Sequence, residues 1–130
     1  MGVSLTSHLH RSASGDPAAS SSDEALLATL LTTAWFVEAR DPYTGGHLWR
    51  VSRYVRLLAD AAGLDPLLAV QASLGGFLHD LGKVAVPDAI LRKPARLTED
   101  EFAVIRTHPE VGVRMLAAHP LAGLVRDAIL

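Results

Sequence analysis

The chain has 130 residues, 49% of them hydrophobic, and a net charge of −2 with its six histidines counted neutral. This length suits one domain of ordinary size, and the near-neutral charge gives no basic surface for binding the phosphates of DNA or RNA. The absence of cysteine excludes thiolate ligands, so a metal site must use histidine and carboxylate. No apolar run reaches the roughly 20 residues that span a bilayer, and a cytoplasmic location is expected.

The first helix is predicted after a polar N-terminal tail. Residues 1–21 are rich in serine, alanine and glycine, and we expect them to form a flexible tail or linker. Ser21 and Glu24 have the spacing of a capping box, which predicts a helix from about Ser21 to Arg40. Its apolar residues follow at helical spacing, namely Leu27, Leu30, Leu31 and Ala34. Alanine and leucine dominate the composition, which favours an all-α fold of packed helices.

A second helix is predicted over residues 44–62, with Gly63 as its C-terminal stop. His47 lies at the N-terminal end of the stripe that we expect to face the core. The stripe continues through Val51, Tyr54, Val55, Leu58 and Ala62. A core-facing histidine at a helix end is either a hydrogen-bonded core residue or a metal ligand, and the helix alone does not distinguish the two.

Asp65 and Pro66 predict the cap and first turn of a third helix. This helix should extend to about His79. Its expected core-facing side consists of Leu67, Val70, Leu74 and Phe77 or Leu78. Gly75 and Gly76 lie one turn before His79, and because glycine weakens a helix, we expect another backbone to approach closely there.

The remaining third of the chain is predicted as short helices. Residues 82–97 should form a connection with short helical or extended pieces, because prolines interrupt its periodicity. Thr98 and Glu101 form a second capping box, which opens a helix. Since a residue that precedes proline avoids the α region, His108 should lie at a helix boundary with its side chain free to turn inward. A last segment over residues 121–130 shows no stop signal.

His79 and Asp80 are the central candidates for a chemical site. They follow an apolar helix, where two polar groups are costly to bury without partners. With His47 and His108 they give three histidines and one carboxylate at helix ends or on core-facing positions. Such mixed nitrogen and oxygen donors suit Fe, Mn, Zn or Co rather than Ca. Taken singly, His47 could equally be a core histidine and His108 a helix cap.

Several stretches resemble, in the same order, the motifs of the HD-GYP family. Residues 41–51 (DPYTGGHLWRV) resemble its opening motif and residues 77–87 (FLHDLGKVAVP) its central motif. Residues 93–102 and 108–112 (HPEVG) resemble the stretches that come after the central motif in the family. The resemblance implies that residues 22–130 are the N-terminal portion of an all-helical HD-domain bundle, incomplete at its C-terminus. Members of this family are bacterial phosphodiesterases that hydrolyse cyclic di-GMP at a centre of two or three metal ions.

The resemblance also implies roles for individual residues. Those that match the family's metal ligands are His47, His79, Asp80 and His108. Asp80 matches the carboxylate that bridges two ions, and Lys83 matches a lysine near the scissile phosphate, where it can stabilise charge on phosphoryl oxygens. Apart from the resemblance, Lys83 could be a solvated turn lysine. Members with three metals carry a glutamate where this chain has Tyr43, so we expect at most two divalent ions, with Fe or Mn favoured and Zn, Co or Ni as alternatives.

The implied function is hydrolysis of cyclic di-GMP to a linear dinucleotide or GMP. The family's later motif, with paired histidines, an aspartate and Gly-Tyr-Pro, is missing from the sequence, so we expect little or no activity from these residues alone. Two alternatives stay open: an HD-type phosphohydrolase with another nucleotide substrate, and a non-catalytic interaction module with an exposed apolar face at residues 113–130. Besides the cyclic dinucleotide, a homodimer partner or an upstream sensory domain is expected.

Overall fold

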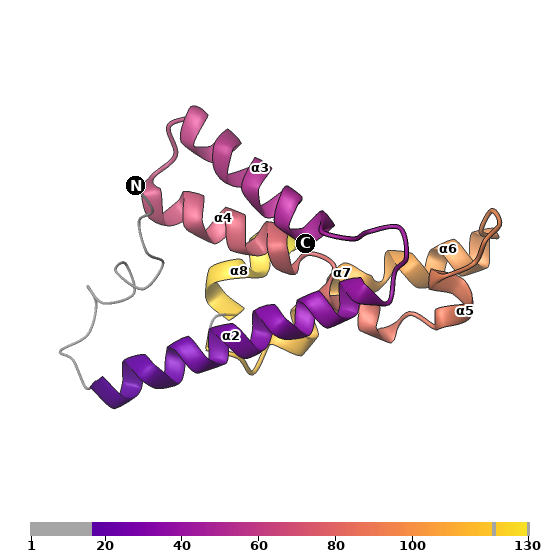
Figure 1. Ribbon diagram of the computed structural model, residues 1–130, viewed down its shortest axis with the longest axis horizontal. Helices are drawn as coiled ribbons and strands as arrows, with labels where there is room; N and C mark the ends of the chain where they lie inside the picture. Colours follow the sequence, from indigo (N-terminus) through magenta and orange to yellow (C-terminus); the bar gives the residue numbers. More distant parts are fainter. Residues whose placement is uncertain (1–16, 121, 130) are drawn as a thin grey trace.

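The computed structural model describes residues 17–120 and 122–129. All regular structure within these ranges is helical, which confirms the predicted all-α class. The elements are α2 (Pro17–Ala39), α3 (His47–Ala61), α4 (Pro66–Leu78), the 3-10 helix η1 (Leu81–Ala85), α5 (Asp88–Leu91), α6 (Glu99–Arg106), α7 (His108–Leu116) and α8 (Ala122–Ile129). Figure 1 shows α5 and α6 extending from one end of the bundle. None of the helices described is long and apolar enough to cross a membrane.

Helix α2 begins earlier than the sequence indicated. The prediction of a start near Ser21 was wrong, because the helix already includes Pro17. Proline is favoured in the first turn, where its missing N–H has no intrahelical partner to lose. Residues 17–21 are therefore helical instead of belonging to a tail, and the remainder of the predicted tail, residues 1–16, lies outside the described residues.

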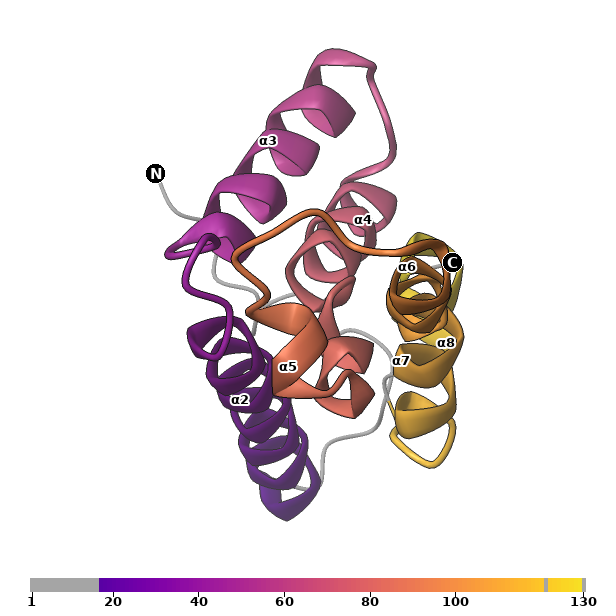
Figure 2. The same cartoon turned by 90° about the vertical axis from the view of Figure 1, so that its right-hand side faces the viewer.

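Helices α3 and α4 pack side by side as an antiparallel pair (Figures 1 and 2). The turn between them uses Gly63 at φ 70°, a conformation that favours glycine. As predicted, the Asp65 side chain caps α4 by accepting from the N–H of Leu67 at 2.8 Å. Gly76 faces α3 so closely that an added Cβ would lie 3.2 Å from the Val55 side chain. The same Cβ would lie 3.5 Å from the main-chain Cα of Ser52, which agrees with the expected approach of another backbone.

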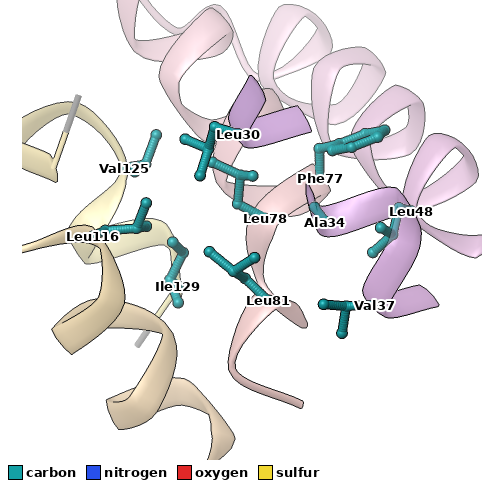
Figure 3. Close-up of a cluster of buried hydrophobic side chains, with 10 residues drawn as sticks. All are labelled: Leu30, Ala34, Val37, Leu48, Phe77, Leu78, Leu81, Leu116, Val125 and Ile129. Carbon is teal, nitrogen blue, oxygen red and sulfur yellow. The ribbon is translucent and has the colours of Figure 1, made fainter. Parts of the chain in front are cut away.

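The hydrophobic core lies where α2, α3, α4, η1, α7 and α8 meet (Figure 3). Its buried members are Leu30, Ala34, Val37, Leu48, Phe77, Leu78, Leu81, Leu116, Val125 and Ile129. The predicted stripe on α3 was partly wrong, because Tyr54 is 60% exposed and Leu58 is 70% exposed. Leu48 and Ala59 are the buried residues of α3 instead. The cause is that α3 packs mainly against α4, so its far side faces solvent, as does Leu67 at the start of α4.

The last two helices pack onto the rest of the described bundle. Helix α8 packs against α4 and α7, and its Val125 and Ile129 are buried together with Leu116 of α7. Figure 3 shows these three side chains pointing toward Leu78 and Leu81. Part of the apolar face expected to be exposed at residues 113–130 is thus covered, whereas Met115 is 44% exposed and Val113, Ala117 and Ala122 line a hollow between α7 and α8. The interaction-module alternative therefore keeps only part of its predicted surface and stays a prediction.

Candidate metal centre

The candidate residues all lie at the ends of helices. His47 is the first residue of α3, and it follows Gly46, whose φ of 70° turns the chain into the helix. His79 and Asp80 lie between the end of α4 and the start of η1. His108 is the first residue of α7, which confirms its predicted place at a helix boundary. Three separate parts of the chain therefore supply the centre.

The Asp80 carboxylate lies at the middle of this group. Its Oδ2 is 3.3 Å from Nε2 of His79 and 3.9 Å from Nε2 of His47. Its Oδ1 is 3.4 Å from Nε2 of His108. His47, His79 and Asp80 each offer one ligand atom, and these three atoms all lie within 4.8 Å of one another. The two oxygens of Asp80 therefore face different histidines, and the structure brings all four predicted donors together.

Two of the histidines are oriented by local main-chain contacts. Nδ1 of His79 lies 2.8 Å from the carbonyl oxygen of Gly76, and Nδ1 of His108 lies 2.7 Å from that of Ile105. A carbonyl oxygen only accepts, so in each ring Nδ1 donates its hydrogen. In the neutral ring this leaves the lone pair of Nε2 free to bind a metal ion beside Asp80, whereas in the protonated ring of His79 Nε2 donates to Asp80 instead. Metal-binding histidines in proteins are commonly fixed in this way.

The charges at the centre favour an ionised Asp80. Burial by itself would raise the pKa of this carboxyl, but hydrogen bonds from His79 and Lys83 outweigh it and hold the pKa well below its usual range. The hydrogen bond to Asp80 raises the pKa of His79, against the opposing effect of burial. Lys83 donates to Asp80 Oδ2 at 2.9 Å. An ionised carboxylate with imidazoles around it is a suitable donor set for a divalent ion.

Helix α7 packs against η1, and this contact places His108 beside Asp80. A Cβ added to Gly82 would overlap the carbonyl oxygen of His108 and lie 2.6 Å from the backbone nitrogen of Gly112. Only glycine permits this approach. The sequence indicated a turn at Gly82 but not that the residue is a contact between two backbones.

Sequence reasoning missed two residues beside the centre, Arg40 and Asp41. The Arg40 guanidinium donates to the carbonyl oxygens of Lys83, Val84 and Val86 at 3.5, 3.1 and 3.0 Å. It also pairs with Asp88 at 2.7 Å. Asp41 Oδ2 lies 4.0 Å from the Lys83 ammonium. The sequence signal was an adjacent pair of charges where the helix was predicted to end, and Asp41 also begins the stretch that resembles the opening family motif.

A third missed residue, Glu38, fixes the start of α3. Its Oε1 accepts from the N–H of Leu48 at 2.8 Å, so it satisfies one of the free donors of the first helical turn. Within the part of the chain that the structure describes, Glu38 and Asp80 are the buried charged side chains. The sequence signal was a carboxylate in an otherwise apolar stretch of helix, which needs a partner when buried.

The donor geometry fits a divalent metal ion. Two ligand atoms that each lie about 2.1 Å from one tetrahedral ion are about 3.4 Å apart. The contacts from Asp80 to His79 and His108, at 3.3 and 3.4 Å, have this spacing. The distance from Asp80 Oδ2 to Nε2 of His47 is longer, at 3.9 Å. The His47 side chain would have to move by only about 0.5 Å to reach the same spacing. The residues present are therefore suited to hold metal.

These features define an all-helical domain with a histidine and aspartate centre built from helix ends. The family model of the HD domain matches residues 44–130, and the chain belongs to this family. It is 42% identical over 95 residues to the "Cyclic di-GMP phosphodiesterase PA4108" of Pseudomonas aeruginosa, a match that covers 72% of this chain and 23% of that protein.

Two further relatives extend the comparison. The "Cyclic di-GMP phosphodiesterase response regulator RpfG" of Xanthomonas campestris is 39% identical over 89 residues, 68% of this chain and 24% of that protein. The "3'3'-cGAMP-specific phosphodiesterase 2" of Vibrio cholerae is 45% identical over 80 residues, 62% of this chain and 15% of that protein. The chain thus spans about a quarter or less of the relatives it matches. The comparisons confirm the family recognised from the motifs.

Proposed function

We propose that residues 22–130 form the N-terminal portion of an HD-GYP-type phosphodiesterase that hydrolyses a cyclic dinucleotide. The observation that carries this proposal is the position of Asp80, whose two oxygens face different histidines. A carboxylate placed in this way is suited to bridge two metal positions. The proposed donors are His47, His79, Asp80 and His108.

Each residue of the centre has a physical task in this reaction. Divalent ions, when bound, supply the positive charge and the water activation that hydrolysis of a phosphodiester needs. The Lys83 ammonium, whose side chain is 17% exposed, lies beside the donors, where it can offset negative charge that develops on a phosphoryl oxygen. Water adds to phosphorus as the bond to the 3′ oxygen breaks, which converts a cyclic dinucleotide to a linear one.

The number of donors limits what this chain does alone. The four described donors are divided between the two sides of Asp80, so neither side has a complete set of protein ligands. We therefore propose weak binding of at most two ions and little or no turnover by the 130-residue chain. Nitrogen and oxygen donors suit Fe or Mn, with Zn, Co and Ni as alternatives.

The relatives support a cyclic dinucleotide as the substrate class. The names of some specify cyclic di-GMP, whereas others specify 3'3'-cGAMP. Both molecules carry two phosphodiester bonds that link two purine nucleosides in a ring. Cyclic di-GMP is the first candidate and 3'3'-cGAMP the second. A homodimer partner or an upstream sensory domain stays a prediction.

Metal binding tests the centre directly. Calorimetric titration of the purified chain with Mn²⁺ should show binding that Asp80→Asn weakens at least about tenfold, because the exchange removes the shared charged donor. Asp60→Asn is the matched control, since it removes the same charge from an exposed pair with Arg56 on α3. Equal Mn²⁺ affinity of wild type and Asp80→Asn would refute the proposed centre. Full turnover of cyclic di-GMP by the isolated chain, followed by chromatography, would refute the proposed lack of activity.

A further inference from the structure

The Lys83 ammonium lies between two carboxylates. It donates to Asp80 Oδ2 at 2.9 Å, and Asp41 Oδ2 lies 4.0 Å away. All three side chains are largely shielded from solvent, with exposed fractions of 17% for Lys83, 10% for Asp80 and 11% for Asp41. A shielded ammonium needs an anionic partner, and this one has two within reach.

One of these partners is also a candidate metal donor. Asp80 Oδ2 is the oxygen that faces both His47 and His79. A divalent ion and an ammonium at ligand distance from the same oxygen repel each other strongly in a shielded site. An ion held by His47, His79 and Asp80 would therefore displace the Lys83 ammonium from Oδ2.

Asp41 is held in a position where its carboxylate can pair with the displaced ammonium. Its backbone N–H donates to the carbonyl of Glu38 at 2.9 Å, and its Oδ1 accepts from the N–H of Tyr43 at 3.0 Å. These contacts fix the carboxylate and leave Oδ2 directed toward Lys83. Meanwhile Arg40 holds the main-chain carbonyl of Lys83. Only the flexible lysine side chain has to move, and the distance to cover is short.

We propose that Asp41 is a positioning residue that holds the Lys83 ammonium when a metal ion takes Asp80. This inference rests on the proposed metal centre. Without Asp41, the displaced ammonium would turn to solvent and lose its place beside the substrate phosphate. With it, Lys83 stays next to the ions although its own partner has been taken.

The chain is suited to a direct test because Lys83 and Lys93 are its only lysines. Labelling lysine with ¹³C and ¹⁵N gives two side-chain NMR signals, and Lys83→Arg assigns them. Lys93, which pairs with Glu101 at 2.6 Å, serves as an internal reference. Diamagnetic Zn²⁺ is the probe metal, since it accepts histidine and carboxylate donors. Asp41→Asn keeps the acceptor for Tyr43 while removing the charge.

In the wild type, Zn²⁺ should shift the Lys83 signal but leave it distinct from that of a free, solvated lysine. In Asp41→Asn, the Lys83 signal should match the wild type without metal and collapse to the free-lysine position with Zn²⁺. Zn²⁺ affinity should also fall by at least about three- to fivefold, since even an exposed ion pair can contribute this much and this one is more shielded. Asp60→Asn should behave as the wild type, and Asp41→Glu should restore part of the Lys83 shift.

The outcomes separate this inference from the proposed function. If Zn²⁺ binds and the Lys83 signals of wild type and Asp41→Asn remain alike, the role of Asp41 is overturned while the metal centre stands. Release of Lys83 to the free-lysine position in Zn²⁺-bound wild type has the same consequence. If Zn²⁺ does not bind the wild type at all, both the centre and this inference are overturned. Melting curves of Asp41→Asn without metal should match the wild type within a few degrees.

Discussion

Replacement of Gly82 by alanine should damage both the fold and the metal centre. Gly82 lies where η1 meets the first turn of α7, and an alanine Cβ would overlap the carbonyl oxygen of His108. It would also lie 2.6 Å from the backbone nitrogen of Gly112. Both obstacles are backbone atoms, so no side-chain rotation can relieve them.

The size of the effect depends on the displacement. Ordinary contact starts near 3.4 Å, so the start of α7, which carries the His108 carbonyl, must move away from η1 by roughly 1.5 Å. Overpacking of this kind costs about 1–3 kcal/mol, and we expect about 3 kcal/mol because two backbones are involved. This is a large fraction of the roughly 5–15 kcal/mol by which domains are stable. The same movement carries His108 away from Asp80, so Mn²⁺ affinity should fall at least about tenfold.

Urea unfolding followed by circular dichroism measures the stability, and calorimetry measures the Mn²⁺ affinity. Gly112→Ala is the matched control from the facing helix, since its Cβ would meet Gly82 and Ile129 at 3.4 to 3.8 Å, which is ordinary contact. Because alanine is the better helix former, this control should stabilise the chain by up to about 1 kcal/mol. An unchanged urea midpoint for Gly82→Ala would show that the backbone approach is not as close as described.

Two further substitutions test contacts outside the donors. Arg40→Gln should lower the free energy of unfolding in urea by about 2 kcal/mol, because it removes charge-assisted hydrogen bonds to main-chain carbonyls. The control Arg56→Gln, in an exposed pair, should lower it by less than about 0.5 kcal/mol. Equal losses for the two variants would contradict this role of Arg40. The hydrogen bond from Lys93 holds the pKa of Glu101 below its usual 4.5, so the pair stabilises the fold above that pH and loses this effect as the pH falls through the folded-state pKa. The melting temperature of Lys93→Met should therefore lie below that of wild type at about pH 7 and approach it as the pH is lowered below 4.5, and a constant difference would contradict the reasoning.

Local signals in the sequence predicted local structure well. Thr98 and Glu101 form the expected capping box, in which Thr98 N–H donates to Glu101 at 2.8 Å and Glu101 N–H donates to the Thr98 hydroxyl at 3.2 Å. Asp65 caps α4 as expected. Such signals depend on residues three or four apart, which meet in any helix start. These capping contacts therefore do not depend on how the rest of the chain folds.

Contacts between distant elements were not predictable in the same way. The stripe on α3 followed helical periodicity through Tyr54 and Leu58, but both are exposed, because periodicity shows which residues share a face and not how much of it a neighbour covers. Arg40 contacts residues more than forty positions later in the chain. Its role depends on where η1 lies, which no local pattern records. The candidate donors could be named from their positions at helix ends, and the family resemblance then assigned them to one centre.

The centre combines local orientation with distant assembly. His79 and His108 each direct Nδ1 to a carbonyl three residues earlier, so each helix end orients its own imidazole without a metal. Bringing these ends together depends on other residues: Gly82 permits the contact between backbones and Arg40 holds η1 on α2. An ion therefore meets donors that are already oriented, and little of its binding energy is spent on ordering them. It follows that substitutions at the assembling residues should weaken metal binding even though none of them is a donor.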